Sequence, residues 1–135
     1  MADYNKVGLL TLRGDRMLLC RKIGLGPLIL PGGRIEDGET PLECLTRELR
    51  EELGDVKLLE PGYVGTYTDR AASEPEKTVE VQLFAGELLG EPTASSEIVE
   101  LVWFGPESDR KCLAPSLVNE ILPDLVARGL LPWNA

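Results

Sequence analysis

The segment TPLECLTRELREEL, residues 40–53, constrains the fold most, because it predicts one helix with two very different sides. Thr40 followed by Pro41 and Glu43 matches a capping box with proline at the first helical position. Gly54 suits the C-terminal cap. Leucines recur at three- and four-residue spacing and form an apolar stripe: Leu42, Leu45, Leu49 and Leu53. We therefore expect an amphipathic helix that packs on the core through this stripe.

The rest of the chain predicts strands with one further helix. Residues 6–22 predict two strands that turn at Gly14 and Asp15. Further strands are expected over residues 28–30, 63–70, 78–88 and 97–105. A second helix over residues 116–129 contains Pro123, which kinks or divides it. This order predicts an α/β fold with helices on both faces of a mixed sheet, in one domain of residues 1–135.

The net charge of −9 limits the classes of partner. A nucleic acid is not expected, because faces that bind its backbone are usually basic. A small phosphorylated ligand is compatible if a cation bridges the two negative charges. The first ten residues lack a signal-peptide pattern, and no apolar run approaches the roughly 18 residues of a membrane span. We expect a cytoplasmic protein with no membrane partner.

The absence of histidine limits the available chemistry. It removes Ser-His-Asp and Cys-His catalysis and any zinc site with histidine ligands. Acid–base catalysis must then use carboxylates, lysine, tyrosine or water activated by a metal ion. The cysteines Cys20, Cys44 and Cys112 are far apart and odd in number, so we expect buried, reduced thiols.

On the expected helix, Glu48, Glu51 and Glu52 share one face, with Cβ atoms about 5–6 Å apart. Like charges at this spacing destabilise an isolated helix, and a solvated charged face is the alternative interpretation. The helix follows a Pro-Gly-Gly turn, in which Gly32 and Gly33 allow the backbone to approach a metal ion or a phosphate. Clustered carboxylate oxygens are what a hard cation such as Mg²⁺ selects. We therefore interpret this face as a magnesium site.

The spacing of these residues matches a known signature. After Gly33 come five residues, then Glu39, seven residues, and Arg47-Glu48-Leu49-x-Glu51-Glu52-x-Gly54. This pattern resembles the Nudix box, the signature of hydrolases that cleave nucleoside diphosphates linked to another group. One position departs from it, because Asp55 stands where the family usually has an aliphatic residue. We expect Val56 to fill the apolar pocket that this aliphatic residue would occupy, so the departure concerns packing more than chemistry.

The resemblance extends to the MutT-like branch, which sanitises oxidised purine nucleoside triphosphates, and covers roughly residues 5–105. It implies a Nudix-type α/β/α sandwich with a mixed, mostly antiparallel sheet between helices. In that branch a Ser-x-Glu segment before a Trp-Phe strand supplies an additional metal-binding glutamate. Here that position is Glu97, with Glu100 as the alternative.

The resemblance also implies which residues hold metal. The ligands of one to three Mg²⁺ ions, with Mn²⁺ as a substitute, would be Glu48, Glu51, Glu52, the Gly32 carbonyl and Glu97. Water activated by the metal would attack phosphorus in line. The base near that water would be Glu52 or Glu48, with Glu97 as an alternative.

Other residues of the pattern would act indirectly or on substrate. Arg47 would orient the glutamates by ion pairing, and Glu39 would brace the loop. The structural positions are Gly33, Glu39 and Gly54. Arg21 and Lys22, just before the loop, would bind phosphate, or else form only a basic strand end.

The residues that are typical of relatives with a particular substrate are mostly missing. Relatives that read an oxidised base use a Trp-Pro-Asp-Asp segment, but residues 114–117 are Ala-Pro-Ser-Leu and lack both carboxylates. Asn119 is a candidate to bind a base, with a solvent-facing amide as the alternative. The proline of ADP-ribose hydrolases is replaced by Arg70, and the tyrosine of dinucleoside polyphosphate hydrolases by Ala-Ala-Ser at residues 71–73.

These observations predict a Mg²⁺-dependent pyrophosphohydrolase of a nucleoside diphosphate linked to another moiety. The first candidate substrate is a nucleoside triphosphate, including oxidised or non-canonical ones, cleaved to the monophosphate and pyrophosphate. The alternatives are NDP-sugars, ADP-ribose-type compounds and dinucleoside polyphosphates, or a Nudix module that binds a nucleotide without catalysis. We expect a small-molecule nucleotide as partner and a monomer or homodimer.

Overall fold

The computed structural model describes residues 2–24, 26–72 and 74–133. Its strands are β1 (Tyr4–Leu10), β2 (Leu12–Arg13), β3 (Arg16–Lys22), β4 (Gly32–Arg34), β5 (Lys57–Arg70), β6 (Thr78–Leu89) and β7 (Ile98–Phe104). Its helical segments are α1 (Pro41–Leu53), a 3₁₀ turn η1 (Arg110–Cys112), a π-helical turn η2 (Leu117–Ile121) and α2 (Leu122–Ala127). The prediction of one domain over residues 1–135 includes positions outside the described residues and stays a prediction. Ser73, which is part of the expected substrate mark at residues 71–73, also lies outside them.

The α/β class is confirmed, with the strands divided between two sheets. The larger sheet has the order β4-β1-β6-β5 and the smaller one the order β2-β3-β7. Only the pairing of β1 with β6 is parallel among these strands, so the sheets are mixed and mostly antiparallel. The hairpin expected at Gly14 and Asp15 is also confirmed, because β2 pairs with β3 across those two residues.

Helix α1 begins and ends where the sequence predicts. Thr40 is the N-cap, its side chain accepts the Glu43 amide hydrogen, and the Glu43 side chain accepts the Thr40 amide hydrogen. Gly54 is the C-cap, with a φ of 80°. The apolar stripe differs in one place, since Leu42 is exposed and Cys44 is fully buried instead. The buried stripe therefore begins at the second turn of the helix.

Replacing Thr40 by alanine is expected to lower the free energy of unfolding by about 1 kcal/mol, because the Glu43 amide loses its acceptor. The control is Thr46→Ala on the exposed middle of α1, where no cap is removed and alanine is the better helix former. Urea denaturation measures both variants. Equal losses in the two variants would contradict the capping role.

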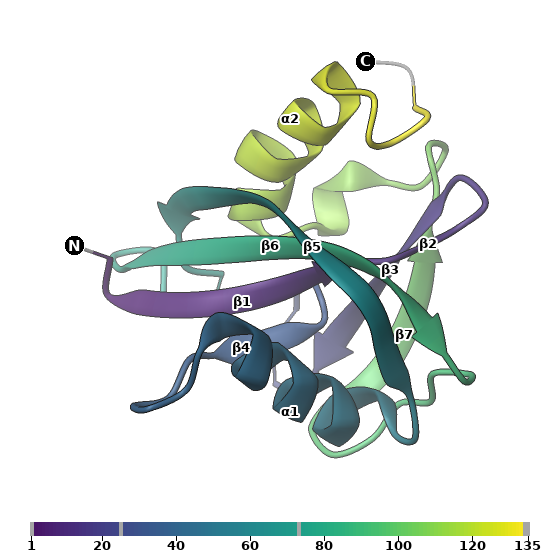
Figure 1. The fold of residues 1–135 in the computed structure, drawn as a ribbon. Coiled ribbons are helices and arrows are strands. Elements are labelled where there is room, and N and C mark those ends of the chain that lie inside the picture. The colour runs from purple at the N-terminus through teal and green to yellow at the C-terminus, as the bar shows by residue number, and fades with distance from the viewer. Residues whose placement is uncertain (1, 25, 73, 134–135) are drawn as a thin grey trace.

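Helices α1 and α2 lie on opposite sides of the larger sheet (Figure 1). The core on the α1 side consists of Val7, Leu9, Leu18, Cys44, Leu45, Leu49, Leu53 and Phe84. The core on the α2 side includes Leu10, Met17, Leu19, Leu83, Phe104, Ile121, Leu122 and Leu125. Adjacent residues such as Leu83 and Phe84 enter different cores, because successive side chains of a strand point to opposite faces. The expected α/β/α layering is confirmed.

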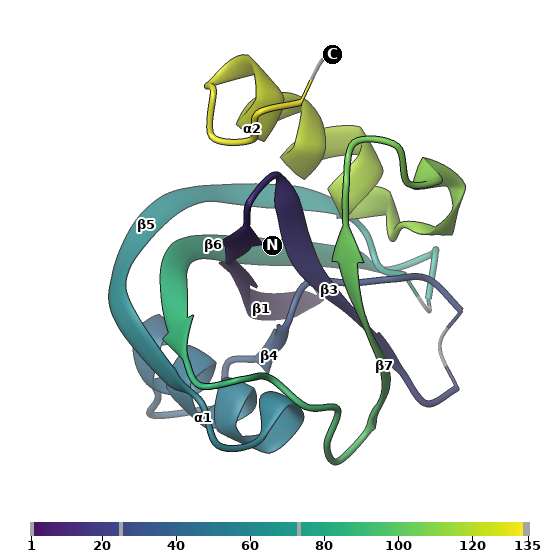
Figure 2. The same cartoon turned by 90° about the vertical axis from the view of Figure 1, so that its right-hand side faces the viewer.

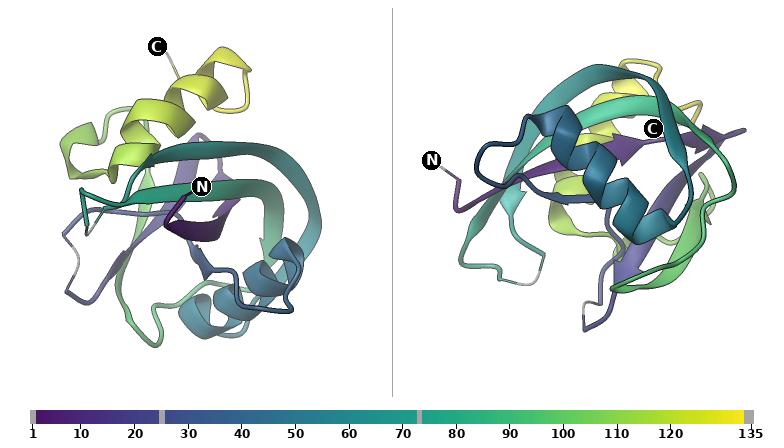
Figure 3. Two further views of the ribbon diagram at one scale, coloured as in Figure 1. Left: turned by 90° about the vertical axis from the view of Figure 1, so that its left-hand side faces the viewer. Right: turned by 60° about the horizontal axis from the view of Figure 1, so that its bottom comes forward.

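Strands β5 and β6 are long and strongly bent (Figure 2). The register of their pairing shifts between Leu59 and Gly62 and again between Tyr63 and Gly65. Glu60, within the first shift, has a φ of 45°. Extra residues of this kind form β-bulges, which bend a strand and increase its twist. The bend carries both strands from the α1 side around the molecule toward α2 (Figure 3).

Pro123 does not divide the second helix. The helix expected over residues 116–129 is helical without a gap from residue 115 to residue 127, and consists mainly of η2 and the short α2. The π turn η2 ends directly before α2, and Ile121 and Leu122 keep right-handed helical dihedrals, so the chain continues through Pro123 although the amide of this proline is missing. Within the described part of the chain, neither helix has the length and hydropathy needed to cross a membrane.

Candidate active site

Gly32 and Gly33, which the sequence predicts in a turn, lie in strand β4, where neither has space for a side chain. Gly32 has a φ of 143°, and a Cβ atom there would lie 2.0 Å from the carbonyl oxygen of Val7. A Cβ atom on Gly33 would lie 2.4 Å from the Cδ atom of Glu48. The backbone of β4 is therefore packed between β1 on one side and a carboxylate of α1 on the other.

Glu52 is the most buried carboxylate of the described chain, with 3% of its surface exposed. Its Oε1 atom accepts a hydrogen bond from the Gly32 amide at 2.9 Å. Its Oε2 atom lies 3.4 Å from Nζ of Lys22. Burial raises the pKa of Glu52 to about 7, although the Gly32 amide and Lys22 both act to lower it. Each of its two carboxylate oxygens thus has one donor nearby, and burial outweighs both in setting the pKa.

Arg47 connects Glu39 to Glu48. Its Nε and Nη2 atoms donate to the two carboxylate oxygens of Glu39, at 2.7 and 2.9 Å. Its Nη1 atom donates to Oε1 of Glu48 at 2.9 Å. The hydrogen bonds from Arg47, followed by one from the Glu36 amide, lower the pKa of Glu39 to about 2. Burial raises the pKa of Glu48, and its bond to Arg47 opposes that rise.

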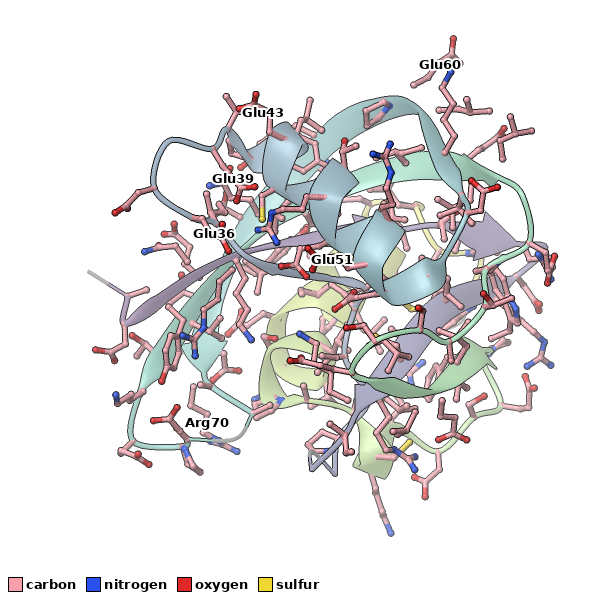
Figure 4. All side chains as sticks on the ribbon, turned by 90° about the horizontal axis from the view of Figure 1, so that it is seen from below. Glu36, Glu39, Glu43, Glu51, Glu60 and Arg70 are labelled. Carbon is pink, nitrogen blue, oxygen red and sulfur yellow. The ribbon has the colours of Figure 1, made fainter. Side chains whose placement is uncertain are left out.

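Glu51 completes the acidic face but lies in solvent. Its side chain is 53% exposed, against 15% for Glu48, and its Oε1 atom is 3.6 Å from Nη1 of Arg47. Glu36, Glu39 and Glu51 lie along α1 and the loop before it, whereas Glu60 lies well away (Figure 4). The three- and four-residue spacing brings the glutamates to one side of the helix, but their burial differs widely.

The two basic residues at the end of β3 have different surroundings. Lys22 contacts Glu52, while Nη1 of Arg21 lies 3.0 Å from Oε1 of Glu100 on β7. This difference follows from the alternation of side chains along a strand. Glu97 lies in the turn before β7 with an exposed side chain, and its carbonyl oxygen accepts the Ile23 amide hydrogen at 2.8 Å. The structure therefore brings Lys22 to the acidic face, and the choice between Glu97 and Glu100 as metal ligand stays a prediction.

The donors on the acidic face suit a hard divalent cation in their chemistry. Glu48, Glu51 and Glu52 offer carboxylate oxygens, which Mg²⁺ prefers. Burial raises the pKa of Glu48 and of Glu52, and a neighbouring cation would reverse that effect. As they stand, no three acidic or cysteine side chains of the described residues are close enough to share one ion. The chemistry of these residues therefore fits a divalent cation, although their present side-chain positions do not form a complete site.

A cleft that is partly open to solvent lies beside Gly32 and Gly33 of β4. Its basic residues are Lys6, Lys22 and Arg34. Its apolar residues include Ile29, Leu30, Ala71, Ala72, Val79, Val81, Ala114 and Leu117. Gly32 and Lys22, which both contact Glu52, belong to the lining, so Glu52 lies directly behind the wall of the cleft. The cleft thus combines a cationic end near the acidic face with an apolar remainder.

Sequence reasoning missed Lys6, Arg34 and Tyr4 as residues of this cleft. Lys6 and Tyr4 share a face of β1, and Lys6 lies beside Val81 of β6 and Arg34 of β4. Burial, followed by the charges of Lys22 and Arg34, lowers the pKa of Lys6. The guanidinium of Arg34 lies 4.2 Å from the centre of the Tyr4 ring. The signal available in the sequence was Lys6, which is followed by the apolar residues of β1. The sequence could not show that this side chain enters the cleft, because its direction depends on the pairing of β1 with β6.

Asn119 lies away from the lining of the cleft. It is exposed, and its Nδ2 atom donates to Asp69 at 2.8 Å. Ser116, on the preceding turn, lines the cleft together with Leu117. Arg70 lies far from α1 (Figure 4). Of the expected base-binding region, the part that borders the cleft is therefore Ala114, Ser116 and Leu117.

Glu52 should make stability fall as pH rises toward neutrality. Its folded pKa of about 7 exceeds the ordinary value of 4.5, so the folded protein retains a proton that the unfolded chain releases. At 1.36 kcal/mol per pKa unit, the free energy of unfolding should fall by about 3 kcal/mol between those two pH values. Glu52→Gln removes this contribution. Urea denaturation at pH 5 and pH 8 in EDTA measures it, and identical pH slopes in both proteins would contradict it.

Three known proteins show what the chain is similar to. YvcI of Bacillus subtilis (strain 168), an uncharacterized Nudix hydrolase, is 30% identical over 92 residues, which are 66% of this chain and 58% of the relative. An RNA pyrophosphohydrolase of Halorhodospira halophila (strain DSM 244 / SL1) is 47% identical over 49 residues, which are 36% of this chain and 27% of the relative. The structure of the MutT protein from Methanosarcina mazei Go1 has a TM-score of 0.76 at 22% identity, with 93% of this chain and 94% of that chain covered.

These similarities differ in what they establish. The chain spans 58% and 27% of the length of the two curated relatives, and the MutT likeness concerns the fold alone. The model of the NUDIX domain family, in contrast, matches residues 5–121, which include α1 and all seven strands apart from the first residue of β1. The chain therefore belongs to the NUDIX domain family.

Proposed function

We propose that this protein is a Mg²⁺-dependent hydrolase of phosphoanhydride bonds in a nucleoside diphosphate linked to another moiety. The observation that carries the proposal is the cleft, whose basic wall adjoins the buried Glu52 at Gly32 and Lys22. A pyrophosphate with its cation needs both acidic groups for the metal and basic groups for the phosphates. Family membership supports the same class of reaction.

The residues of α1 would divide the chemistry among themselves. A bound cation would neutralise charge on the pyrophosphate and lower the pKa of the attacking water. Glu52 is the first candidate for the base, because it lies behind the wall of the cleft, in contact with Gly32 and Lys22. Glu48 is the second candidate, and its position depends on Arg47, which Glu39 holds in turn. Glu51 and Glu97 are exposed carboxylates that would complete the metal ligands.

A nucleoside triphosphate, cleaved to the monophosphate and pyrophosphate, is the substrate that the cleft supports best. Three cationic side chains match the charge of a triphosphate, and the apolar remainder of the cleft suits a base. The described lining contains no Asp, Glu, Asn or Gln side chain. Polar recognition of a base would then depend on Ser116, Tyr4 and the backbone, which does not favour an oxidised purine over others.

Other substrates are alternatives that the same site accommodates in principle. NDP-sugars, ADP-ribose-type compounds and dinucleoside polyphosphates also contain the pyrophosphate unit. The relative named RNA pyrophosphohydrolase adds an RNA substrate, which the net charge of −9 disfavours for any long chain. We propose a cytoplasmic monomer or homodimer, with Mn²⁺ able to replace Mg²⁺.

An activity screen tests the proposal. The protein is incubated with Mg²⁺ or Mn²⁺ and with canonical and oxidised nucleoside triphosphates, NDP-sugars, ADP-ribose, dinucleoside polyphosphates and a triphosphorylated RNA oligomer. We expect a nucleoside monophosphate and pyrophosphate as products, and no turnover in EDTA. A nucleotide that raises the melting temperature without any product would instead support a binding module.

A further inference from the structure

The contact between Lys22 and Glu52 occupies a place that a metal ion would also need. Oε1 of Glu52 is bound by the Gly32 amide, and Oε2 lies 3.4 Å from the Lys22 ammonium group. The Lys22 side chain is only 20% exposed, so the pair is largely removed from solvent. An ammonium group and a divalent cation repel each other strongly at such short range. A divalent cation that binds Oε2 would therefore take the position of the ammonium group.

The cleft offers Lys22 a second position. Lys22 already forms part of its lining, next to Lys6 and Arg34. A lysine side chain has a flexible four-carbon stem, so its ammonium group can change partner without a change in the backbone. Three cations in one cleft repel one another, and that repulsion ends when phosphate groups enter. The phosphates of a substrate would therefore provide the partner that Lys22 loses on leaving Glu52.

We propose that Lys22 is an exchangeable counter-ion, which neutralises Glu52 before metal binds and moves to the substrate phosphates when a divalent cation takes its place. This inference rests on the proposed function, because it assumes that Glu52 is a metal ligand. Lys22 is a positioning residue for Glu52 in the first state and a substrate-binding residue in the second. The exchange makes binding of metal and binding of phosphate favour each other.

Lys22→Met tests the first half of the exchange, with Lys6→Met as the matched control. Lys6→Met makes the same chemical change in the same cleft, but Lys6 has no carboxylate within ion-pair distance among the described residues. In EDTA at pH 8, Lys22→Met should lower the melting temperature by about 5 °C, because buried Glu52 loses its partner. Lys6→Met should not lower it, since burial already disfavours the charge of Lys6.

Calorimetric titration with Mg²⁺ alone measures the competition directly. Lys22→Met should bind Mg²⁺ about tenfold more tightly than the wild type, since no ammonium group has to leave, while Lys6→Met should change the affinity less than about threefold. Lys22→Gln repeats the test if the methionine variant fails to fold. Equal gains in the Lys22 and Lys6 variants would overturn the exchange in favour of a general effect of charge.

Titration with inorganic pyrophosphate in saturating Mg²⁺ measures the second half. Lys22→Met should weaken pyrophosphate binding about tenfold, and unchanged binding would overturn the move to phosphate. A wild type that neither binds Mg²⁺ nor hydrolyses nucleotides would overturn the proposed function itself. A wild type that does both, beside a Lys22→Met variant with unchanged Mg²⁺ affinity, would overturn only the exchange.

Discussion

Glu52→Gln is expected to lower Mg²⁺-dependent nucleotide hydrolysis by about 10³-fold while the protein still folds. The amide cannot serve as a base, and it is a poorer ligand for a divalent cation than a carboxylate. Glu52 also lies directly behind the cleft wall, where it contacts both Gly32 and Lys22. The loss should appear mainly in kcat, because the substrate contacts in the cleft remain.

The fold should survive this substitution for a reason that the structure makes specific. The carbonyl oxygen of the glutamine can still accept the Gly32 amide hydrogen, so β4 keeps its connection to α1. The buried charge disappears as well, which removes the destabilisation expected near pH 7. Lys22 loses an ion pair, but it can turn toward solvent in the open cleft.

The control is Glu87→Gln, which makes the same chemical change at an exposed position of β6. Steady-state kinetics with Mg²⁺ and circular dichroism are recorded for both variants. We expect near-wild-type kcat for Glu87→Gln. A Glu52→Gln variant that folds and keeps more than about a tenth of the wild-type kcat would remove Glu52 from the catalytic assignment.

Gly32→Ala is expected to lower the free energy of unfolding by about 3 kcal/mol or more. The new methyl group would lie 2.0 Å from the Val7 carbonyl oxygen, which belongs to the backbone of β1 and cannot turn aside. A φ of 143° is also unfavourable for any residue with a side chain. Relief requires β4 to separate from β1, which also displaces the amide that binds Glu52.

Gly62→Ala is the control for this second substitution. Gly62 is exposed on β5, a Cβ atom there would have no other atom within 4 Å, and its φ is not in the left-handed region. Urea denaturation should place this variant within about 1 kcal/mol of the wild type. If Gly32→Ala were equally mild, the close packing of β4 against β1 at Gly32 could not be important for stability.

The ends of α1 were predictable from the sequence because they depend on neighbouring residues. A capping box involves residues three positions apart, and a glycine cap needs only its own backbone conformation. The sequence located an irregularity near Pro123, but the helix continues through this residue after a π turn and is not divided there. Leu42 was misjudged, because helical spacing gives the direction of a side chain but not whether another element covers it.

The two-sheet arrangement was not predictable in the same way. β1 pairs in parallel with β6, which lies about seventy residues later, while β3 pairs with β7. No local pattern encodes such partners, because strands of similar composition have similar local preferences. The bulges that bend β5 likewise arise in its pairing with β6.

In the acidic face of α1, too, the sequence determines one part of the site and the tertiary structure determines the rest. Helical geometry alone places Glu48, Glu51 and Glu52 on one side of α1, since an interval of three or four residues is close to one turn. Their different burial, and hence the raised pKa of Glu52, follows from what packs against α1. The contact of Lys22 with Glu52 and the position of Lys6 in the cleft require β1, β3 and β4 to meet. Spacing along one helix therefore identified the carboxylates, whereas the cations of the cleft come from strands that only folding brings together.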